Sequence, residues 1–289
     1  MRILFALVCL FATAVGRAQI SVEVALDQET YLANEPLIAK VRISNASGQT
    51  IRMGMPADWL TFIISARDNL IVTQRGPVPV EGEFKSESST TVIKRVNLEP
   101  YFNLGQSGRY SVVAVVRIPE WDQVFSSRPK DFNVTGGAKL WETSFGVPSP
   151  GKTNVSPEVR RYVLQQAAHV KDIRLYFRLT DEGGAQTYRV LTLGKMTSFS
   201  HPEPQLDRES NLHVLFQTSA RGFNYSVITP DGELKTRQVY DYSDTRPILH
   251  AEENGNISVN GGIRRVTSND IPKPTQFDDS PKNEKPKTQ

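Results

Sequence analysis

The chain has 289 residues, of which 38% are hydrophobic and 22% are charged, and this composition suits a soluble protein with one or two globular domains. The formal net charge is +3, and it falls to about +1 if residues 1–18, which hold two arginines and no acid, are removed. The remaining sequence has no basic run in its folded part, so we expect no nucleic-acid binding.

The N-terminal segment has the pattern of a secretion signal. Arg2 precedes an apolar run from Ile3 to Val15, and the small residues Gly16 and Ala18 suit a cleavage after Ala18. We therefore predict a secreted or periplasmic protein. The apolar run is too short to span a membrane and no later stretch approaches the needed length, so we expect no membrane span in the mature chain.

Residues 19–135 are predicted to form a β-sandwich. In Leu37–Ser44 apolar and polar residues alternate, which is the period-two pattern of a half-buried strand. About seven short strands, separated by Gly, Pro, Asn and Asp, are typical of a sandwich of this length. The clearest of these runs are Ser21–Leu26, Leu37–Ser44, Trp59–Ala66, Thr90–Leu98, Arg109–Ile118 and Val124–Val134.

Two motifs in this domain carry a resemblance. In LDQETYLANEPLIAKVRISNASG, Tyr31 and the pair Glu35-Pro36 lead into a strand that ends in Asn45. This segment resembles the opening of bacterial immunoglobulin-like domains, and it is similar in outline to macroglobulin-type domains and to a bacterial proteinase-inhibitor domain. The segment around Tyr110 resembles the approach to the sixth strand of such sandwiches. The resemblance implies that Tyr110 pins a corner by a backbone hydrogen bond and is structural.

The next segment, residues 136–156, is rich in Gly and Pro and is predicted to connect two domains. Its large apolar residues Leu140, Trp141 and Phe145 are expected to dock at the domain junction.

A single amphipathic helix is predicted to follow, from Pro157 to about Lys171. Ser156 suits the N-cap and Pro157 suits the first helical position. Because the apolar residues then follow helical spacing along one stripe, we expect the helix to cover the sheet that comes after it. These residues are Val159, Tyr162, Val163, Ala167 and Val170.

Residues 157–265 as a whole are predicted to be this helix and a small antiparallel β-repeat domain. Asn211–Tyr240 has the pattern of three strands joined by two tight turns. Asp172–Phe177 and Gly255–Val259 align with its first strand at spacings of about 40–45 residues, the range of β-propeller blades. A closed propeller takes at least four blades, so we predict an open, blade-like meander. Residues 266–289 have few apolar residues and are predicted to be a disordered tail.

Aromatic residues are better candidates for a binding site than the histidines and acids of this chain. Trp121, between Glu120 and Asp122, is expected in a hairpin loop, where an exposed tryptophan can stack on a sugar or anchor a protein partner. The alternative is that Trp121 folds back over the end of the sandwich or against the second domain. Tyr240 and Tyr242 are expected to flank the edge of the second sheet.

Signatures of catalysis are missing from the sequence, so we expect neither a cofactor nor a metal site, and no enzyme. The only cysteine, Cys9, lies in the secretion signal, which excludes thiol chemistry from the mature chain. A cluster of His201, His213 and His250 with Asp207 is conceivable. We favour the alternative that His213 faces outward and that the other histidines are loop residues.

Taken whole, the chain resembles uncharacterised exported bacterial proteins that join an immunoglobulin-like domain to a β-repeat domain, chiefly through SNLHVLFQTSARGFNYSVITPDGEL. The resemblance implies no activity. The leading hypothesis is a non-catalytic exported binding or structural protein that engages a protein partner or an extracellular glycan through sandwich loops and the sheet edge. The alternatives are a proteinase inhibitor that uses the loop Val78–Phe84, and a hydrolase with a site near His201, Asp207 and His250.

Overall fold

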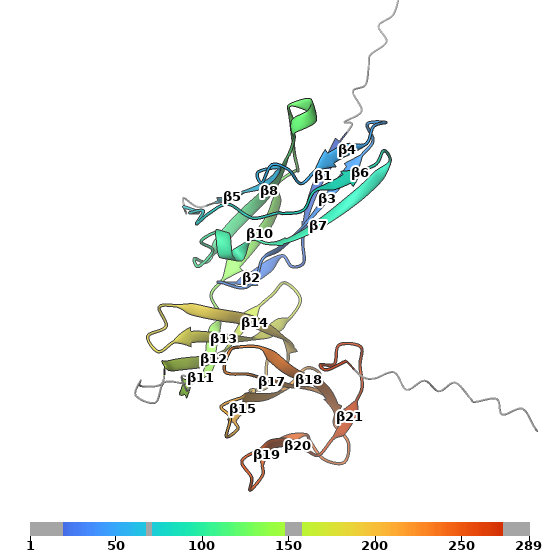
Figure 1. The fold of residues 1–289 in the computed structure, drawn as a ribbon. Coiled ribbons are helices and arrows are strands. Elements are labelled where there is room, and N and C mark those ends of the chain that lie inside the picture. Colours follow the sequence, from blue (N-terminus) through green and yellow to red (C-terminus); the bar gives the residue numbers. More distant parts are fainter. Residues whose placement is uncertain (1–19, 68–70, 148–157, 274–289) are drawn as a thin grey trace, which may run out of the picture. The chain divides into compact units, whose positions relative to one another are not determined.

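The computed structural model describes residues 20–67, 71–147 and 158–273, in a chain that divides into two compact units, Met1–Thr135 and Gly136–Gln289 (Figure 1). Both units consist mainly of β-strands, as predicted. Within the described ranges the helical pieces are two short 3-10 turns, η1 (Glu99–Tyr101) and η2 (Pro119–Trp121). None of the described helical residues forms a helix long and apolar enough to cross a membrane. The predicted secretion signal lies outside the described residues.

The first unit contains two sheets that share one hydrophobic core. The strand order is β1-β3-β7 in one sheet and β2-β10-β8-β5 in the other, where β9 also pairs with β8 and β2 pairs with β10 in parallel. A short ribbon of β4 and β6 accompanies them. The strands are β1 (Ile20–Leu26), β2 (Thr30–Leu32), β3 (Ile38–Asn45), β4 (Ile51–Met53), β5 (Leu60–Ala66), β6 (Phe84–Ser86), β7 (Thr90–Asn97), β8 (Gly108–Ile118), β9 (Gln123–Ser126) and β10 (Lys130–Thr135).

Alternation along β3 places its apolar residues in this core. Ala39, Val41 and Ile43 have no exposed surface, whereas the side chains between them are directed away from the core. Each aliphatic side chain that is buried in this way contributes about 1.5–3 kcal/mol. Trp59 is fully buried as well, and its indole N–H donates to the carbonyl of Val80 at 2.7 Å, so its one polar group is satisfied.

The corner predicted at Tyr110 is confirmed. The hydroxyl of this buried tyrosine donates to the carbonyl oxygen of Gln106 at 2.7 Å, and its ring stacks on Phe132 with 5.5 Å between the centroids. The loop before β8 is thereby fixed to the core.

We predict that Tyr110→Phe lowers the free energy of unfolding of the first unit by about 1 kcal/mol, because it deletes one hydrogen bond and leaves the packed ring in place. Urea denaturation followed by circular dichroism measures the loss. Ser126→Ala, which removes an exposed hydroxyl from the same unit, serves as the control. Equal stability of Tyr110→Phe and the wild type would show that the corner bond carries no weight.

The second unit begins with a four-stranded antiparallel sheet in the order β11-β12-β13-β14. Its strands are β11 (Ala138–Val147), β12 (Glu158–Ala168), β13 (Ile173–Asp181) and β14 (Thr187–Met196). The prediction of a connection over residues 136–156 is therefore wrong for β11, and residues 148–157 lie outside the described part. Leu140 and Trp141 pack against the core of this unit and Phe145 lies in it, which is not the place expected for them.

The predicted helix is also wrong, because its residues form β12. Tyr162, Val163 and Leu164 are all buried, and because successive residues of a strand point to opposite faces, both faces of this segment are covered. Apolar residues on both faces of a strand imitate the i, i+3, i+4 spacing of a helix. The strand is chosen by its pairing on both sides, since Leu164 lies opposite Trp141 in β11 and opposite Phe177 in β13.

A second sheet follows in the order β15-β16-β17-β18-β21, together with the hairpin β19-β20. The three strands predicted within Asn211–Tyr240 are confirmed as β16, β17 and β18. The predicted repeat is displaced by one strand, because β13 is the third strand of its sheet whereas β16 is the second. The bounds are β15 (Glu203–Leu206), β16 (Leu212–Gln217), β17 (Gly222–Ile228), β18 (Leu234–Asp241), β19 (Ile248–Ala251), β20 (Ile257–Asn260) and β21 (Ile263–Arg265).

The second sheet of this unit is buried on both faces. Val214 and Phe216 of β16 belong to the core that the two sheets share, whereas Leu215 between them belongs to a smaller cluster that includes Leu249 of the hairpin. Burial on both sides explains the uninterrupted apolar run in β16.

The prediction of a disordered tail from residue 266 onward is wrong as far as Ile271. Ile271 forms an antiparallel bridge with Arg237 of β18. The carboxylate of Asp270 is 2% exposed and accepts hydrogen bonds from Arg264 at 2.6 Å and from the hydroxyl of Thr267 at 2.7 Å. These contacts bind the segment to the sheet as far as Ile271, and residues 274–289 lie outside the described part.

Candidate functional site

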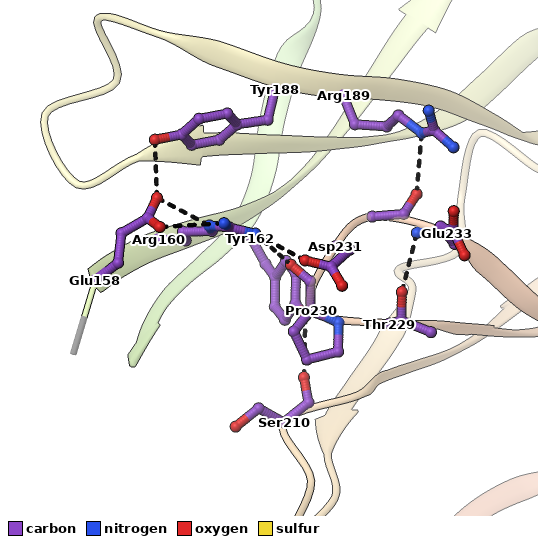
Figure 2. Close-up of polar contacts among 11 residues, drawn as sticks. Glu158, Arg160, Tyr162, Tyr188, Arg189, Ser210, Thr229, Pro230, Asp231 and Glu233 are labelled. Atoms are coloured by element: carbon purple, nitrogen blue, oxygen red, sulfur yellow. Dashed lines mark hydrogen bonds and ion pairs between the residues drawn. The ribbon is translucent and has the colours of Figure 1, made fainter. Parts of the chain in front are cut away.

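A polar cluster closes one end of the core between the two sheets of the second unit (Figure 2). Arg160 of β12 donates to both carboxylate oxygens of Glu158 at 3.0 and 3.1 Å. It also donates to the carbonyl of Pro230 and to Asp231, each at 3.2 Å, in the turn between β17 and β18. The hydroxyl of Tyr188 donates to Glu158 at 3.0 Å.

The charges of this cluster neutralise one another. The hydrogen bonds from Arg160 and then Tyr188 lower the pKa of Glu158, and the bond to Glu158 is the main cause that raises the pKa of Arg160. Arg189 donates to the carbonyl of Gly232 in the same turn at 3.4 Å (Figure 2). Glu158 and Asp231 are both paired with Arg160, and the bonds from Arg160 and Arg189 to the turn join the two sheets.

A second polar group lies inside the second sheet, at His213 of β16. Its Nδ1 is 2.6 Å from the Tyr225 hydroxyl and its Nε2 is 3.2 Å from Asp207. Asp207 also accepts hydrogen bonds from the backbone N–H groups of Glu209 and Asn211 and from the Asn211 side chain. The expectation that His213 faces outward is wrong, because only 6% of this residue is exposed.

Proton positions in this group follow from its pKa values. Burial lowers the pKa of His213 more than Asp207 raises it, so the imidazole is neutral near pH 7. Since the carboxylate of Asp207 can only accept, Nε2–H donates to it and Nδ1 accepts from the Tyr225 hydroxyl. Burial also raises the pKa of Tyr225, which keeps that hydroxyl protonated. The three groups are mutually satisfied, as in a structural polar network.

The histidine cluster that the sequence made conceivable does not form around Asp207. His201 and His250 are both exposed, and the imidazole that Asp207 contacts is that of His213. Within the described ranges no three His, Cys, Asp or Glu side chains gather as they would around a metal ion.

The opposite end of the shared core carries an apolar depression. It lies beyond the ends of β12 and β14, and Phe199 on its wall is 76% exposed. Val170, which lies in sequence between the lining residues His169 and Lys171, is 79% exposed. Met196 and Ile173, which line the depression, also pack in the core between the sheets. The hollow of about 450 Å³ therefore opens on the end of that core; its remaining lining includes Ala168, His169, Lys171, Asp172 and Lys195.

Of the residues predicted to bind, Trp121 ends the turn η2 and packs partly against the core of the first unit. Glu120 and Asp122 beside it are exposed, and Asp122 has a φ of 49°. The loop proposed for an inhibitor is held down as well, because Val78 and Val80 are buried.

The two predicted tyrosines differ in their surroundings. Tyr240 of β18 is half-buried against Tyr225, donates to Gln238 at 3.0 Å and lies under the Arg264 guanidinium. Tyr242 is 41% exposed, and the structure places it just after β18. Neither tyrosine belongs to the unit that contains Trp121, so the predicted site residues do not form one cluster within a unit.

Sequence reasoning did not identify the depression. Val170 was assigned to the buried stripe of a helix, and Phe199 stands among polar residues in a segment without a motif. The only signal in the sequence was that Val170 and Phe199 are apolar residues with polar neighbours. Whether such residues are exposed depends on where β12 and β14 end, which the sequence did not show.

No protein-family model matches the chain, and no curated protein matches it. Among solved structures, the chain is similar to the sporulation control protein Spo0M from Bacillus subtilis, with 10% identity, a TM-score of 0.31, and coverage of 60% of this chain and 90% of that one. A likeness at this TM-score assigns neither a fold nor a function.

Proposed function

We propose that the chain is a non-catalytic, exported binding protein, and that its second unit holds an apolar segment of a protein partner in the depression beside Phe199. One observation carries this proposal: Phe199 is mostly exposed on the wall of an open hollow whose lining includes Met196 and Ile173 of the core between two sheets. Exposed apolar groups that gather around a concavity mark interaction sites on soluble proteins.

The chemistry of the rim favours a partner that is apolar and acidic. Lys171 and Lys195 are exposed at the depression, whereas the carboxylate of Asp172 accepts from Arg174 at 3.2 Å. Positive charge around an apolar centre speeds the association of an acidic partner and selects it over a basic one. Burial of an aromatic side chain at the centre of such an interface typically contributes more than about 1 kcal/mol.

The non-catalytic part of the proposal is supported by the polar groups of the second unit. The His213 cluster brings together a hydroxyl, an imidazole and a carboxylate of the kinds that catalysis uses, but His213 and Tyr225 are buried within the sheet, out of reach of a substrate. A hydrolase near Asp207 is therefore less favoured. An inhibitor that uses Val78–Phe84 is less favoured for a different reason, since Val78 and Val80 of that loop are buried. Trp121, with Glu120 and Asp122, remains a second surface for the same binding function, with a glycan as its ligand.

We also propose that the first unit is an immunoglobulin-like sandwich and that the second is a blade-like repeat domain, in a chain that is exported by cleavage after Ala18. The corner bond of Tyr110 and the single core between two sheets support the first assignment. Two successive meanders followed by a hairpin support the second.

The test compares capture by immobilised mature protein in three forms: wild type, Phe199→Ser and the control Ile248→Ser, whose exposed side chain lies on β19 of the same unit. We expect a partner from the envelope extract of the source organism that binds the wild type and the control alike. Its affinity for Phe199→Ser should fall at least about tenfold, a loss of about 1.4 kcal/mol.

Phe199 is so exposed that its replacement should leave the stability of the protein within about 0.5 kcal/mol of the wild type, and urea denaturation checks this. Retention of the same partner by Phe199→Ser with unchanged affinity would remove the depression from the proposal. Binding to a glycan array that Trp121→Ala abolishes would move the function to the loops of the first unit.

A further inference from the structure

One long edge of the first unit is open between its two sheets. β1 is the outermost strand of its sheet, because it pairs with β3 on one side and with no described strand on the other. On the opposing sheet, β9 and the first residues of β10 pair with β8 alone, since β2 reaches only residues 133–135 of β10. Each sheet therefore has a free strand edge on this side.

A groove runs along this side of the unit. It has a volume of about 820 Å³, and its lining includes residues 20–24 of β1 on one wall and Phe125, Arg128, Pro129 and Lys130 on the other. Successive residues of a strand point to opposite faces, so five residues in a row line one groove only where the groove follows the edge of the strand. The N–H and C=O groups on the free edge of β1 therefore border the groove.

The opposite wall does not offer a continuous second ladder. Three residues between β9 and β10 stand opposite two residues of β8, which is the count of a β-bulge. Ser127 in this bulge turns its N–H toward β8, where it donates to the carbonyl of Ala114 at 2.9 Å. Pro129 follows and has no N–H to donate. A polypeptide in the groove would thus pair with β1 and meet the other wall through side chains.

The walls of the groove are apolar and carry more positive than negative charge. Val24 on one wall and Phe125 on the other are half-buried, and both pack against the core of the unit. The lining holds two bases, Arg128 and Lys130, and one acid, Glu23. Both bases lie on the wall that faces β1, so an acidic residue in the groove meets them directly.

We infer that this groove binds an extended segment of a partner polypeptide, which adds to β1 as a further strand and in which apolar residues alternate with acidic ones. In strand addition the main-chain hydrogen bonds supply affinity, and contacts to alternate side chains supply specificity. Apolar side chains of the added strand pack on Val24 and Phe125, and acidic ones complement Arg128 and Lys130. The groove lies in the other unit from the depression at Phe199, so it adds a separate binding surface to the proposed function.

A second copy of this chain fits the groove less well. Two-fold pairing of β1 with β1 would also bring together the neighbouring edges of the two copies, and with them both sets of Arg128 and Lys130. Like charges that are brought together repel each other, whereas a single added strand has no basic wall of its own.

The experiment selects ligands from a phage-displayed library of random nonapeptides, which are long enough to cover the seven residues of β1. The immobilised protein is mature Phe199→Ser, so that the depression of the second unit is not the surface selected. We expect enriched peptides in which apolar and acidic residues alternate. The strongest is then synthesised with a fluorescent label and titrated by anisotropy. No enrichment, or enrichment of basic peptides, overturns the inference and leaves the proposal for the depression standing.

Backbone pairing is tested with two N-methylated forms of this peptide, one methylated at its odd residues and one at its even residues. An added strand directs the N–H groups of every second residue toward β1. One form should therefore bind at least about tenfold more weakly, whereas the other should stay within about threefold of the parent peptide. Equal affinities of the two forms would show that no strand is added.

Charge variants then locate the peptide. The double variant Arg128→Glu with Lys130→Glu should bind it at least about tenfold more weakly, and a peptide with lysine in place of each acid should bind this variant better than the wild type. Arg95→Glu, which changes an exposed arginine of β7 at the other edge of the β1 sheet, should bind like the wild type.

Two results would contradict this location. Unchanged affinity of the double variant would place the peptide on another surface. A dimer of the mature protein that the peptide dissociates in analytical ultracentrifugation would show that a second copy occupies the edge of β1. The titrations of the two N-methylated forms need neither variant, so they decide on strand addition even if the double variant does not fold.

Discussion

Replacement of Phe177 by alanine is expected to lower the free energy of unfolding of the second unit by about 3–5 kcal/mol. Phe177 has no exposed surface and lies in the core between the two sheets, with its ring 5.5 Å from that of Tyr162. Tyr162 in turn stacks on Phe145 at 3.9 Å between ring centroids. Alanine at position 177 removes one end of this aromatic row and leaves a cavity that two hydrogen-bonded sheets cannot close.

Chemical denaturation measures this loss, and the fluorescence of Trp141 reports on it, because this tryptophan packs against the same core. Val170→Ala is the control, since Val170 is mostly exposed and its truncation should change the free energy of unfolding by less than about 0.5 kcal/mol. A loss below about 1 kcal/mol for Phe177→Ala would contradict the shared core, because truncation of a packed phenylalanine costs several times more.

Replacement of Asp207 by alanine is expected to have the second large effect, a loss of about 3 kcal/mol or more in the free energy of unfolding. The substitution leaves the N–H of Asn211 and Nε2–H of His213 without their acceptor, at about 1–3 kcal/mol for each of these partly buried groups. Asp207→Asn keeps one acceptor oxygen, so its free energy of unfolding should fall clearly less than that of Asp207→Ala. Asp231→Ala, whose carboxylate is 77% exposed, is the matched control for removal of an acid.

The same group gives the second unit a defined dependence on pH. Burial lowers the pKa of His213 below its ordinary value of 6.5, so the unfolded state binds the proton more readily than the folded state. The free energy of unfolding is therefore highest above pH 6.5 and falls as the pH drops from 6.5 through the lower folded-state pKa. Burial alone would raise the pKa of Asp207, but its hydrogen bonds outweigh burial and lower it below 3.8. The stabilisation from Asp207 is present above pH 3.8 and is lost as the pH falls through its folded-state value.

Urea midpoints between pH 8 and pH 5 measure the contribution of His213. We expect His213→Gln to flatten the fall in stability below pH 6.5. His169→Gln is needed as a comparison, since burial also lowers the pKa of His169 and adds a loss of the same sign. An unchanged slope in His213→Gln would show that this imidazole does not titrate with unfolding.

Local patterns in the sequence were enough for much of the first unit. The alternation in Leu37–Ser44 predicted the strand that the structure has as Ile38–Asn45, and the resemblance of the segment around Tyr110 to known sandwiches implied its corner bond. In the second unit, the turns around Asn211–Tyr240 predicted three strands correctly. These features succeed because period-two alternation and turn residues act over a few positions, within the reach of a local pattern.

The strand β12 shows where a local pattern is insufficient. A suitable cap and a helical spacing of apolar residues both favoured a helix, but neither contains information about pairing. The segment is a strand because β11 and β13 supply hydrogen bonds on both of its edges. Its residues Tyr162 and Leu164 are also buried in the core between the two sheets. Tertiary contacts override a local preference of this size, since helix and strand propensities differ by less than about 1 kcal/mol per residue.

The sequence by itself determined the strand-rich character of this protein and many of its strand positions, because these depend on neighbours along the chain. The tertiary structure decided which groups meet. It brought His213 to Asp207 and left Phe199 exposed at the end of a core. The physical reason is that periodicity shows which face of a strand is apolar, whereas partner, register and the place where a sheet ends follow from contacts between segments that are distant in sequence.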